Sequence, residues 1–435
     1  MTRQADEMQR LEYASPTEIE QHQVGRLRNL LNFLQQESVN AFYQEKLAGI
    51  NPANLQSLAD LPSLPLTLKA ELVSQQSHYP PYGQNLSYAP ECYTKLHQTS
   101  GTTGHPLKIL DTAESWDWWA RCWVEVFRAA GVTEKDRVFV AFSFGLFIGF
   151  WTAYEGAGKL GALVIPGGGM DTPQRLAAIF DHEATVICST PSYALHMAEV
   201  AEQKKLDLAS SKVRVLIHAG EPGASIPPVR RRIEEVWGAT VHDHAGATEI
   251  GAYGFSCAAQ VGLHVNESEF IVEVLERGSD QPVPPGEPGE LVVTNLGRWG
   301  FPVIRYRTGD MVRLAKEPCT CGRTYKLLQG GVIGRVDNMV IVRGINIFPS
   351  AIEAIIREII PQNEFRLIFS RVKGLDELEI EVEVAQDELD KLETLMALFR
   401  QRLALRVPVR AVEPGAFPRF QLKARRILDR RTSLA

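Results

Sequence analysis

The sequence predicts an α/β protein with a large N-terminal part built on mixed and parallel sheets and a small α+β C-terminal part. Between Val138 and Gln203, short apolar runs alternate with amphipathic segments, as in parallel sheets whose faces are covered by helices. After Arg335 the pattern changes to a helix, two strands and a second helix, over about one hundred residues, which is an ordinary domain size. The chain has 435 residues, 45% of them apolar, enough for both parts to have a core.

The N-terminal region is expected to begin with one long helix over 15–45. An apolar stripe at helical spacing predicts it, formed by Ile19, Val24, Leu27, Leu30, Leu31 and Leu34. Pro62 and Pro65 indicate an irregular stretch after this helix. Trp116, Trp119 and Trp123 also recur at helical spacing, which is typical of a helix packed in the core or at a subunit contact.

The alternating region predicts the central sheet. Strands are expected at 138–142, 162–166 and 185–189, and helices at 149–160, 172–182 and 193–203. Ligands of such sheets gather at the carboxyl ends of the strands. Gly220-Glu221-Pro222 and the turn carrying Thr248 and Glu249 should therefore lie at this edge.

The C-terminal part is predicted to contain helices at 350–360 and 387–405 and strands at 365–370 and 377–384. Ser350, with Glu353 three residues later, has the pattern of a helix cap. We place the junction at Asp337, which gives an N-terminal domain over 1–336 and a C-terminal domain over 337–435. In isolation, 334–338 also fits an ordinary surface turn.

The loop from Gln98 to Pro106 is rich in hydroxyl groups and glycine. It contains Thr99, Ser100, Gly101, Thr102, Thr103, Gly104 and His105. Glycines let successive backbone N–H groups converge on phosphate oxygens, and the hydroxyls add donors, so ATP is the first ligand to consider. A surface turn has a similar composition, and the loop lacks the Lys of the Gly-x-x-x-x-Gly-Lys-Ser/Thr phosphate loop. A phosphate-binding role for this loop therefore requires supporting residues elsewhere in the chain.

Five further motifs follow along the chain. They are Ala245-Gly246-Ala247-Thr248-Glu249, Arg305-Tyr306-Arg307-Thr308-Gly309-Asp310, the run at 334–339, the run Arg343-Gly344-Ile345-Asn346-Ile347-Phe348-Pro349 and the run at 418–423. The first two read as strands that end in a turn, with Asp310 at a tip. Together with the loop, these motifs resemble the adenylate-forming superfamily of acyl-CoA synthetases, luciferases and peptide-synthetase adenylation domains. The runs at 144–147, 190–195, 262–264 and 343–349 resemble its phenylacetate-CoA ligase branch. The likeness covers the chain from about Tyr43 onward.

The resemblance implies the adenylate-forming enzyme fold with a mobile C-terminal lid, and an ATP-dependent acid-thiol ligase. In such a reaction a carboxylate attacks the α-phosphorus of ATP, giving an acyl-adenylate and pyrophosphate, and the thiol of CoA then displaces AMP. Because a carboxylate and a polyphosphate repel one another, Mg²⁺ and cationic donors are needed. Rotation of the lid about Asp337 would separate the two half-reactions.

The resemblance also assigns residues. Glu249 would bind Mg²⁺, Thr248 would donate to the α-phosphate and Lys423 would reach the charge that develops between carboxylate and phosphate. The loop from Ser100 to Gly104 would hold the outer phosphates. Asp310 would accept the ribose hydroxyls with help from Arg335. The adenine would be framed by Gly220, Glu221, Pro222, Asp243 and His244, and the thiol path would involve Arg343 and Gly344.

An aromatic acyl pocket is expected in the stretch with Phe142, Phe144, Phe147 and Ile148, although core packing explains any single Phe equally well. An aryl or arylacetic acid fits such a pocket best. Two positions depart from the branch. Ala245 stands where a Tyr is usual, which removes a ring that would stack beside the adenine or line the acyl pocket. His105 stands where a Lys is usual, so one fixed positive charge near pyrophosphate becomes titratable.

Cysteine usage suggests a metal site. Cys257, His264, Cys319 and Cys321 match the three-thiolate, one-imidazole set of a closed structural zinc site, but the spacing is not a standard Cys-x-x-Cys pair. Free reduced thiols are the alternative, and the resemblance favours zinc. Cys92, Cys122 and Cys188 read as buried or inert thiols.

Composition excludes several classes of protein. A net charge of −6 argues against a general nucleic-acid binder, and no apolar run is long enough to span a membrane. The polar start is unlike a signal peptide, so a cytoplasmic location is expected. The resemblance implies a homodimer. Two alternative functions stay open: an adenylating enzyme that passes its acyl group to a carrier-protein thiol or an amine, and a zinc-stabilised binding module with a decayed nucleotide site.

Overall fold

The computed structural model describes residues 8–99, 106–336, 340–342, 345–361, 363–372, 375–403, 405–419 and 426–431. Several residues with expected roles lie outside the described residues: Ser100, Gly101, Thr102, Thr103, Gly104, His105, Asp337, Arg343, Gly344 and Lys423. Everything below concerns the described part of the chain.

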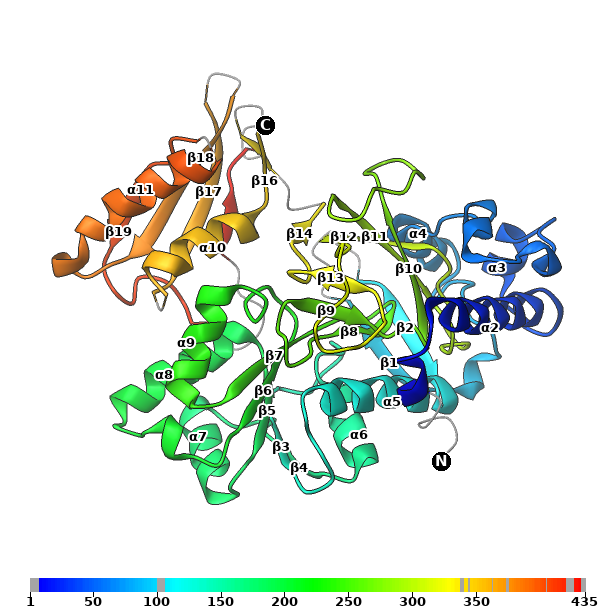
Figure 1. The fold of residues 1–435 in the computed structure, drawn as a ribbon, viewed down its shortest axis with the longest axis horizontal. Helices are drawn as coiled ribbons and strands as arrows, with labels where there is room; N and C mark the ends of the chain where they lie inside the picture. Colours follow the sequence, from blue (N-terminus) through cyan, green and yellow to red (C-terminus); the bar gives the residue numbers. More distant parts are fainter. Residues whose placement is uncertain are drawn as a thin grey trace.

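An eight-stranded mixed sheet forms the centre of the large part, in the order β13-β9-β8-β7-β6-β5-β3-β4 (Figure 1). The parallel strands are β3 (Arg137–Val140), β4 (Leu163–Pro166), β5 (Val186–Ser189), β6 (Val215–His218) and β7 (Thr240–Ala247). The antiparallel strands are β8 (Gly251–Phe255), β9 (Gly262–Val265) and β13 (Leu327–Gln329). Since β4 and β5 lie on opposite sides of β3, the strand order reverses there, and such a reversal opens a crevice for ligands.

Helices cover both faces of the parallel strands, as predicted (Figure 1). They are α5 (Ala113–Ala129), α6 (Trp151–Leu160), α7 (Thr172–Asp181), α8 (Pro191–Gln203) and α9 (Pro227–Trp237). Side chains alternate between the faces of a strand. Val138 and Val140 of β3 thus pack in the core that contains α5, whereas Phe139 packs in the core of α7, α8 and α9.

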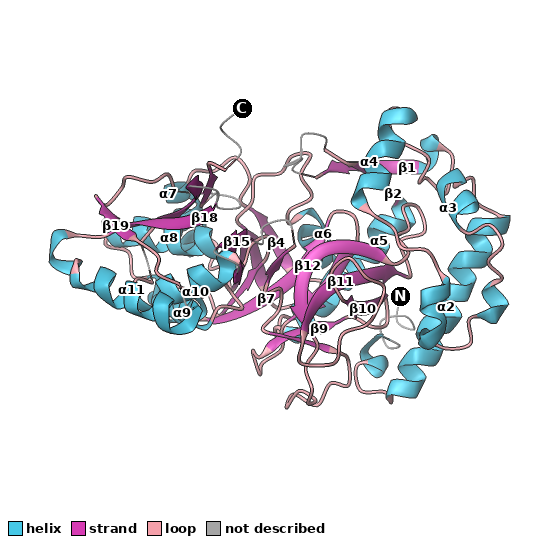
Figure 2. Ribbon diagram, turned by 90° about the horizontal axis from the view of Figure 1, so that it is seen from above, coloured by secondary structure: helices cyan, strands magenta, loops and turns pink. Residues whose placement is uncertain are grey.

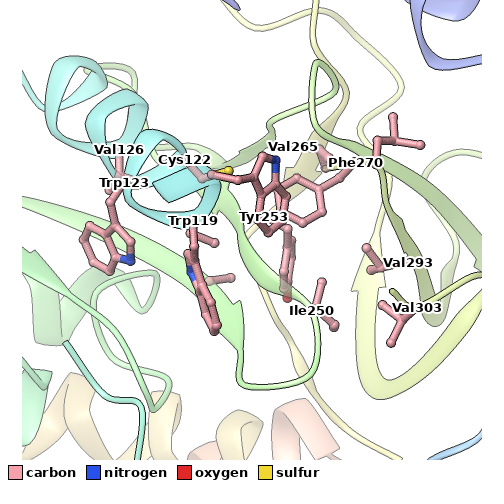
Figure 3. Close-up of a cluster of buried hydrophobic side chains, with 14 of the residues drawn as sticks. Trp119, Cys122, Trp123, Val126, Ile250, Tyr253, Val265, Phe270, Val293 and Val303 are labelled. Atoms are coloured by element: carbon pink, nitrogen blue, oxygen red, sulfur yellow. The ribbon is translucent and has the colours of Figure 1, made fainter. Parts of the chain in front are cut away.

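A second sheet of four strands packs beside the first. Its strands are β10 (Phe270–Leu275), β11 (Pro288–Asn295), β12 (Tyr306–Arg313) and β14 (Gly334–Arg335), and β1 (Tyr93–Gln98) and β2 (Lys108–Thr112) form a separate hairpin. Helix α5 lies between the sheets, and Figure 3 shows its Cys122 next to Tyr253 and Phe270. The predicted core role of Trp116, Trp119 and Trp123 is confirmed, since all three are buried. Cys122 and Cys188 are buried as predicted, but Cys92 is exposed.

The predicted N-terminal helix over 15–45 is wrong as a single element. The structure has α2 (Pro16–Gln36) and α3 (Ala41–Lys46), because the Asn40 side chain accepts a hydrogen bond from Tyr43 N at 3.0 Å and starts a new helix. Short helices follow up to β1: η1 (Pro52–Asn54), η2 (Leu58–Ser63), α4 (Lys69–His78) and η3 (Pro90–Cys92). A further one, η4 (Leu208–Ser210), precedes β6.

The C-terminal part has its own apolar core, made entirely of residues between Val340 and Val409. Its elements are β15 (Val340–Val342), β16 (Ile345–Ile347), α10 (Pro349–Ile359), β17 (Phe365–Val372), β18 (Leu375–Glu383), η5 (Gln386–Glu388), α11 (Asp390–Leu403), β19 (Val409–Val412) and β20 (Ile427–Asp429). The predicted cap at Ser350 is wrong: Phe348 occupies the cap position, and the Ser350 hydroxyl donates to Ile333 O instead. Figure 2 shows β18, β19 and α11 at the end of the molecule opposite α2 and α3.

None of the helices in the described ranges is long and apolar enough to cross a membrane.

Candidate nucleotide and acyl site

Three predicted groups lie just beyond the carboxyl ends of parallel strands. Phe142 follows β3, Gly220-Glu221-Pro222 follows β6, and Thr248 and Glu249 follow β7. Because these ends meet at one edge of a parallel sheet, the motifs come together there although they are far apart in the chain. The sequence-based placement of Gly220 and of the Thr248-Glu249 turn at this edge is confirmed.

The Thr248-Glu249 turn is buried and held on several sides. Ile250 N donates to Ala247 O at 3.0 Å, which closes the turn. One carboxylate oxygen of Glu249 lies 3.0 Å from Lys69 Nζ and accepts a hydrogen bond from the Tyr306 hydroxyl at 3.3 Å. Burial and the nearby Glu249 carboxylate both raise the pKa of Tyr306, so this phenol remains protonated and donates.

Asp310 lies inside β12, paired in register with Arg335 of β14, so its predicted position at a strand tip is wrong. The strand continues past it to Arg313 because β11 pairs with both halves of β12, on either side of an irregularity in register. Arg335 Nη1 donates to Asp310 Oδ1 at 2.6 Å, which places the two groups expected at the ribose side by side.

Two buried phenols lie close to residues of several distant motifs, since the Tyr306 hydroxyl donates to Glu249 Oε1 at 3.3 Å and Tyr306 begins the strand that carries Asp310. The pKa of Tyr306 is affected by Glu249, Arg335 and Asp310, in addition to burial. Burial also raises the pKa of Tyr253, and the carboxylates of Asp310 and Asp243 raise it further. Tyr306 and Tyr253 therefore link the metal, ribose and adenine groups that the resemblance assigned.

Asp243 is the most strongly perturbed carboxyl group at this edge. Burial raises its pKa to about 7. Gly331, at a φ of +71°, packs against it, and a Cβ added there would lie 3.3 Å from Asp243 Oδ2. Adjacent residues of a strand point to opposite faces, and His244 accordingly packs on Trp123, with ring centroids 4.3 Å apart. Burial lowers the pKa of His244 to about 4, so its ring is neutral.

Glu221 faces two neighbours of different kinds. Its carboxylate accepts a hydrogen bond from Ser192 N at 2.8 Å, in the first turn of α8. Its charge also acts on Arg426 of the C-terminal part. Glu221 of the predicted adenine group therefore also lies near the C-terminal part.

The aromatic stretch after β3 forms a cluster. Phe142 is buried, and its ring centroid lies 5.7 Å from that of Phe144 and 6.3 Å from that of Phe147. The Phe147 residue is 43% exposed. A Cβ added at Gly149, whose φ is +40°, would lie 1.9 Å from the Phe142 ring, so only glycine fits beneath it. Ala245 is buried on β7, opposite Gly254 of β8.

The four predicted zinc ligands converge. The ligand atoms of Cys257, His264, Cys319 and Cys321 all lie within 4.8 Å of one another. Cys257 Sγ is 3.6 Å from Cys319 Sγ, and Cys321 Sγ is 3.3 Å from His264 Nε2. His264 Nδ1 lies 3.2 Å from Tyr325 O, which orients the ring so that Nε2 faces the thiols.

Sequence reasoning missed three residues that support the site. Lys69 reaches Glu249 because Thr67 N donates to Arg305 O and Arg307 N donates to Thr67 O, which attaches the start of α4 to β12. Arg298 and Asp111 form a fully buried ion pair, and Arg298 donates a hydrogen bond to Thr248 O in the Thr248-Glu249 turn. No local sequence pattern identifies Lys69, Arg298 or Asp111 as site residues. Tyr306, in contrast, lies within one of the motifs recognised in the sequence.

Two family models match the chain. The AMP-binding enzyme model matches residues 73–297, and the model of the AMP-binding enzyme C-terminal domain matches residues 344–431. The chain belongs to the AMP-binding enzyme family.

Among relatives, the chain is 31% identical to the phenylacetate-coenzyme A ligase of Thermus thermophilus, over 94% of this chain and 96% of that protein. Among solved structures, it matches 2-hydroxyisobutyryl-CoA ligase in the postadenylation state, with a TM-score of 0.91, 30% identity and coverage of 98% and 92% of the two chains. The same ligase in the thioesterification state gives a TM-score of 0.73 at 30% identity, over 97% and 92% of the chains.

Proposed function

We propose that this chain is an ATP-dependent acid-thiol ligase that adenylates an aromatic carboxylic acid and transfers the acyl group to CoA, releasing AMP and pyrophosphate. The observation that carries this function is that Tyr306 donates to Glu249 Oε1 at 3.3 Å and starts the strand on which Asp310 pairs with Arg335. Membership of the AMP-binding enzyme family and similarity to a phenylacetate-coenzyme A ligase support it.

The residues at the sheet edge suit the adenylation step. Thr248 donates its hydroxyl to the α-phosphate, Asp310 accepts the ribose hydroxyls, and Arg335 neutralises Asp310 and adds a donor beside the ribose. The buried Glu249 carboxylate contacts the Lys69 ammonium and the Tyr306 phenol, and it offers the oxygen ligand that Mg²⁺ prefers. Bound there, Mg²⁺ would offset the negative charge of the triphosphate.

The other residues with roles in the two half-reactions are assigned by the resemblance. Ser100 to Gly104 hold the outer phosphates, Gly220, Pro222 and Asp243 lie along the adenine, and Lys423 reaches the reacting carboxylate. The C-terminal domain over 337–435 then turns about Asp337, and Arg343 and Gly344 line the path of the thiol. The separate apolar core of residues 340–409 supports such a movable unit.

The acyl group is assigned from the aromatic cluster. Phe142 and Phe147 form one wall, and the small Ala245 leaves room that a Tyr would fill. Aryl and arylacetic acids match this wall in shape and polarity, whereas a small hydroxy acid such as 2-hydroxyisobutyrate would leave aromatic surface uncovered.

The function is tested by ATP-pyrophosphate exchange with a panel of aryl, arylacetic and aliphatic acids, followed by product analysis with and without CoA. Exchange with an aromatic acid and a thioester that requires CoA are the expected results. A product formed equally well without CoA would indicate a carrier-protein or amine acceptor, and no exchange with any acid would support the binding module.

We propose further that Cys257, His264, Cys319 and Cys321 bind one structural zinc ion. Four ligand atoms within 4.8 Å of one another fit a tetrahedral ion, and four protein ligands leave no coordination position for a substrate. A homodimer remains an expectation from the resemblance, and a cytoplasmic location remains an expectation from the sequence. The oligomeric state is measured by analytical ultracentrifugation.

A further inference from the structure

Arg419 joins the C-terminal part to the large part of the molecule. Its Nε lies 3.0 Å from Oε2 of Glu199, which is on α8. Its Nη1 and Nη2 donate to the two carboxylate oxygens of Glu383, at the end of β18, at 3.0 and 2.8 Å. One guanidinium therefore bridges a carboxylate of its own unit and a carboxylate of α8.

The two halves of this bridge differ in rigidity. The Glu383 side chain is only 2% exposed and also accepts a hydrogen bond from Phe417 N at 2.8 Å, so it holds Arg419 firmly. Because the guanidinium fork is already oriented, contact with Glu199 requires little further loss of side-chain entropy. Glu199 has a second neighbour, His196 Nδ1, at 3.4 Å on the same helix.

Of the two carboxylates that Arg419 binds, Glu199 is the one whose contact depends on how the C-terminal part is turned. Arg419 and Glu383 move together, whereas α8 belongs to the sheet of the large part. The whole chain matches the postadenylation form of 2-hydroxyisobutyryl-CoA ligase with a TM-score of 0.91 and its thioesterification form with 0.73, so the present arrangement is the former. Glu199 and Arg419 are thus in contact in an adenylation-like arrangement.

We propose that Glu199 is a positioning residue for adenylation: its ion pair with Arg419 latches the C-terminal part over the nucleotide, and the pair breaks before the thiol reacts. This inference rests on the proposed function. In the sequence, Lys423 follows Arg419 by four residues, so the latch acts on the segment that carries the lysine assigned to the first half-reaction. Both partners are about a quarter exposed, at 27% for Glu199 and 26% for Arg419, so solvent moderates the attraction and allows release.

The latch is tested by separating the half-reactions in the full-length protein. Glu199→Gln keeps the shape and removes the charge. Adenylation, measured as ATP-pyrophosphate exchange, is expected to fall about threefold to fivefold, as for a partly exposed ion pair. Thioester formation from preformed acyl-adenylate and CoA is expected to be unchanged or faster. Glu199→Lys, which repels Arg419, should deepen the exchange defect and again spare the second step.

Glu202→Gln is the matched control. Glu202 is exposed on the same helix and lines the same surface groove of about 540 Å³ as Glu199, Phe417 and Arg419, but within the described ranges its carboxylate makes no hydrogen bond or ion pair with the C-terminal part. Both half-reactions of this variant should match those of the wild type. Equal loss of both half-reactions in Glu199→Gln, or no loss in Glu199→Lys, would overturn the latch.

Small-angle X-ray scattering of the same variants tests the latch by a measurement that does not depend on enzyme activity. The wild-type curve is expected to fit the present arrangement, and the Glu199→Lys curve to depart from it, while circular dichroism shows both to be folded. Identical curves would refute the latch even for an active enzyme. Different curves from a protein with no exchange activity would support the latch while refuting the proposed function.

Discussion

Arg298 and Asp111 form an ion pair with no exposed side-chain surface, directly behind the Thr248-Glu249 turn. Arg298 Nε and Nη2 donate to the two carboxylate oxygens of Asp111 at 2.7 and 2.6 Å. The remaining Nη1 donates to Thr248 O at 2.7 Å. The Trp119 ring packs on the guanidinium, with Arg298 Cζ 4.5 Å from the ring centroid. The turn that carries Glu249 is therefore fixed by a charge pair that water does not reach.

Breaking this pair should destabilise the protein strongly. Asp111→Leu or Arg298→Met leaves one buried charge without its partner, which is expected to lower the free energy of unfolding by about 3–5 kcal/mol. Chemical denaturation measures the loss. The double variant Asp111→Leu with Arg298→Met should lose much less than the sum of the single changes, because no charge is left unpaired. Simple additivity would show that the two residues do not act as a pair.

Glu249→Gln should abolish most adenylation while leaving the fold intact. The amide can still accept the Tyr306 hydrogen bond, but it lacks the charge that would hold Mg²⁺, so the exchange rate is expected to fall by about a hundredfold or more. Tyr306→Phe is the comparison, since it removes one hydrogen bond to Glu249 and no charge. A Glu249→Gln variant with wild-type exchange would remove Glu249 from the proposed site.

Asp243 should make the stability of the protein depend on pH. Its folded pKa of about 7 lies above the reference value of 3.8, so the folded state binds its proton more tightly than the unfolded state. The associated stability is complete below about pH 4 and is lost as the pH rises through about 7. Asp243→Asn mimics the protonated acid, so the Tm of the variant should fall less than that of the wild type between pH 4 and pH 7. Parallel Tm curves for the two proteins would contradict this assignment.

The cysteine cluster should contain one zinc ion per chain, as measured by elemental analysis of the purified protein. Cys319→Ser is expected to lower the zinc content and the Tm, since a structural metal contributes directly to folding. Cys92→Ser is a suitable control because Cys92 is exposed and lies outside the cluster. Removal of the metal with a chelator should lower the Tm of the wild type and leave that of Cys319→Ser nearly unchanged. A metal-free wild-type protein of undiminished Tm would refute the site.

Several expectations failed where contacts between distant segments override local pattern. One helix is predicted over 15–45, yet α2 ends at Gln36. Asn40, whose side-chain amide donates to Asn85 Oδ1 at 2.9 Å, then starts another helix by accepting from Tyr43 N. Ser350 has the pattern of a cap, but its hydroxyl is engaged by Ile333 O. Gly309 and Asp310 look like a turn, and pairing with β11 and β14 keeps them in a strand. The junction at Asp337 and the role of Lys423 remain predictions.

The sequence by itself determined the strand and helix alternation, the carboxyl-end positions of Gly220 and Thr248, and the set of three cysteines and one histidine that converge. These follow from periodicity, turn residues and ligand chemistry, which are local properties. Only the tertiary structure decided that Lys69 reaches Glu249, that Arg298 and Asp111 support the turn, and that Glu199 meets Arg419. Such pairs join residues that are about two hundred positions apart in the sequence. No local pattern specifies them, because a buried or bridging charge finds its partner only when the packed core brings the two segments together.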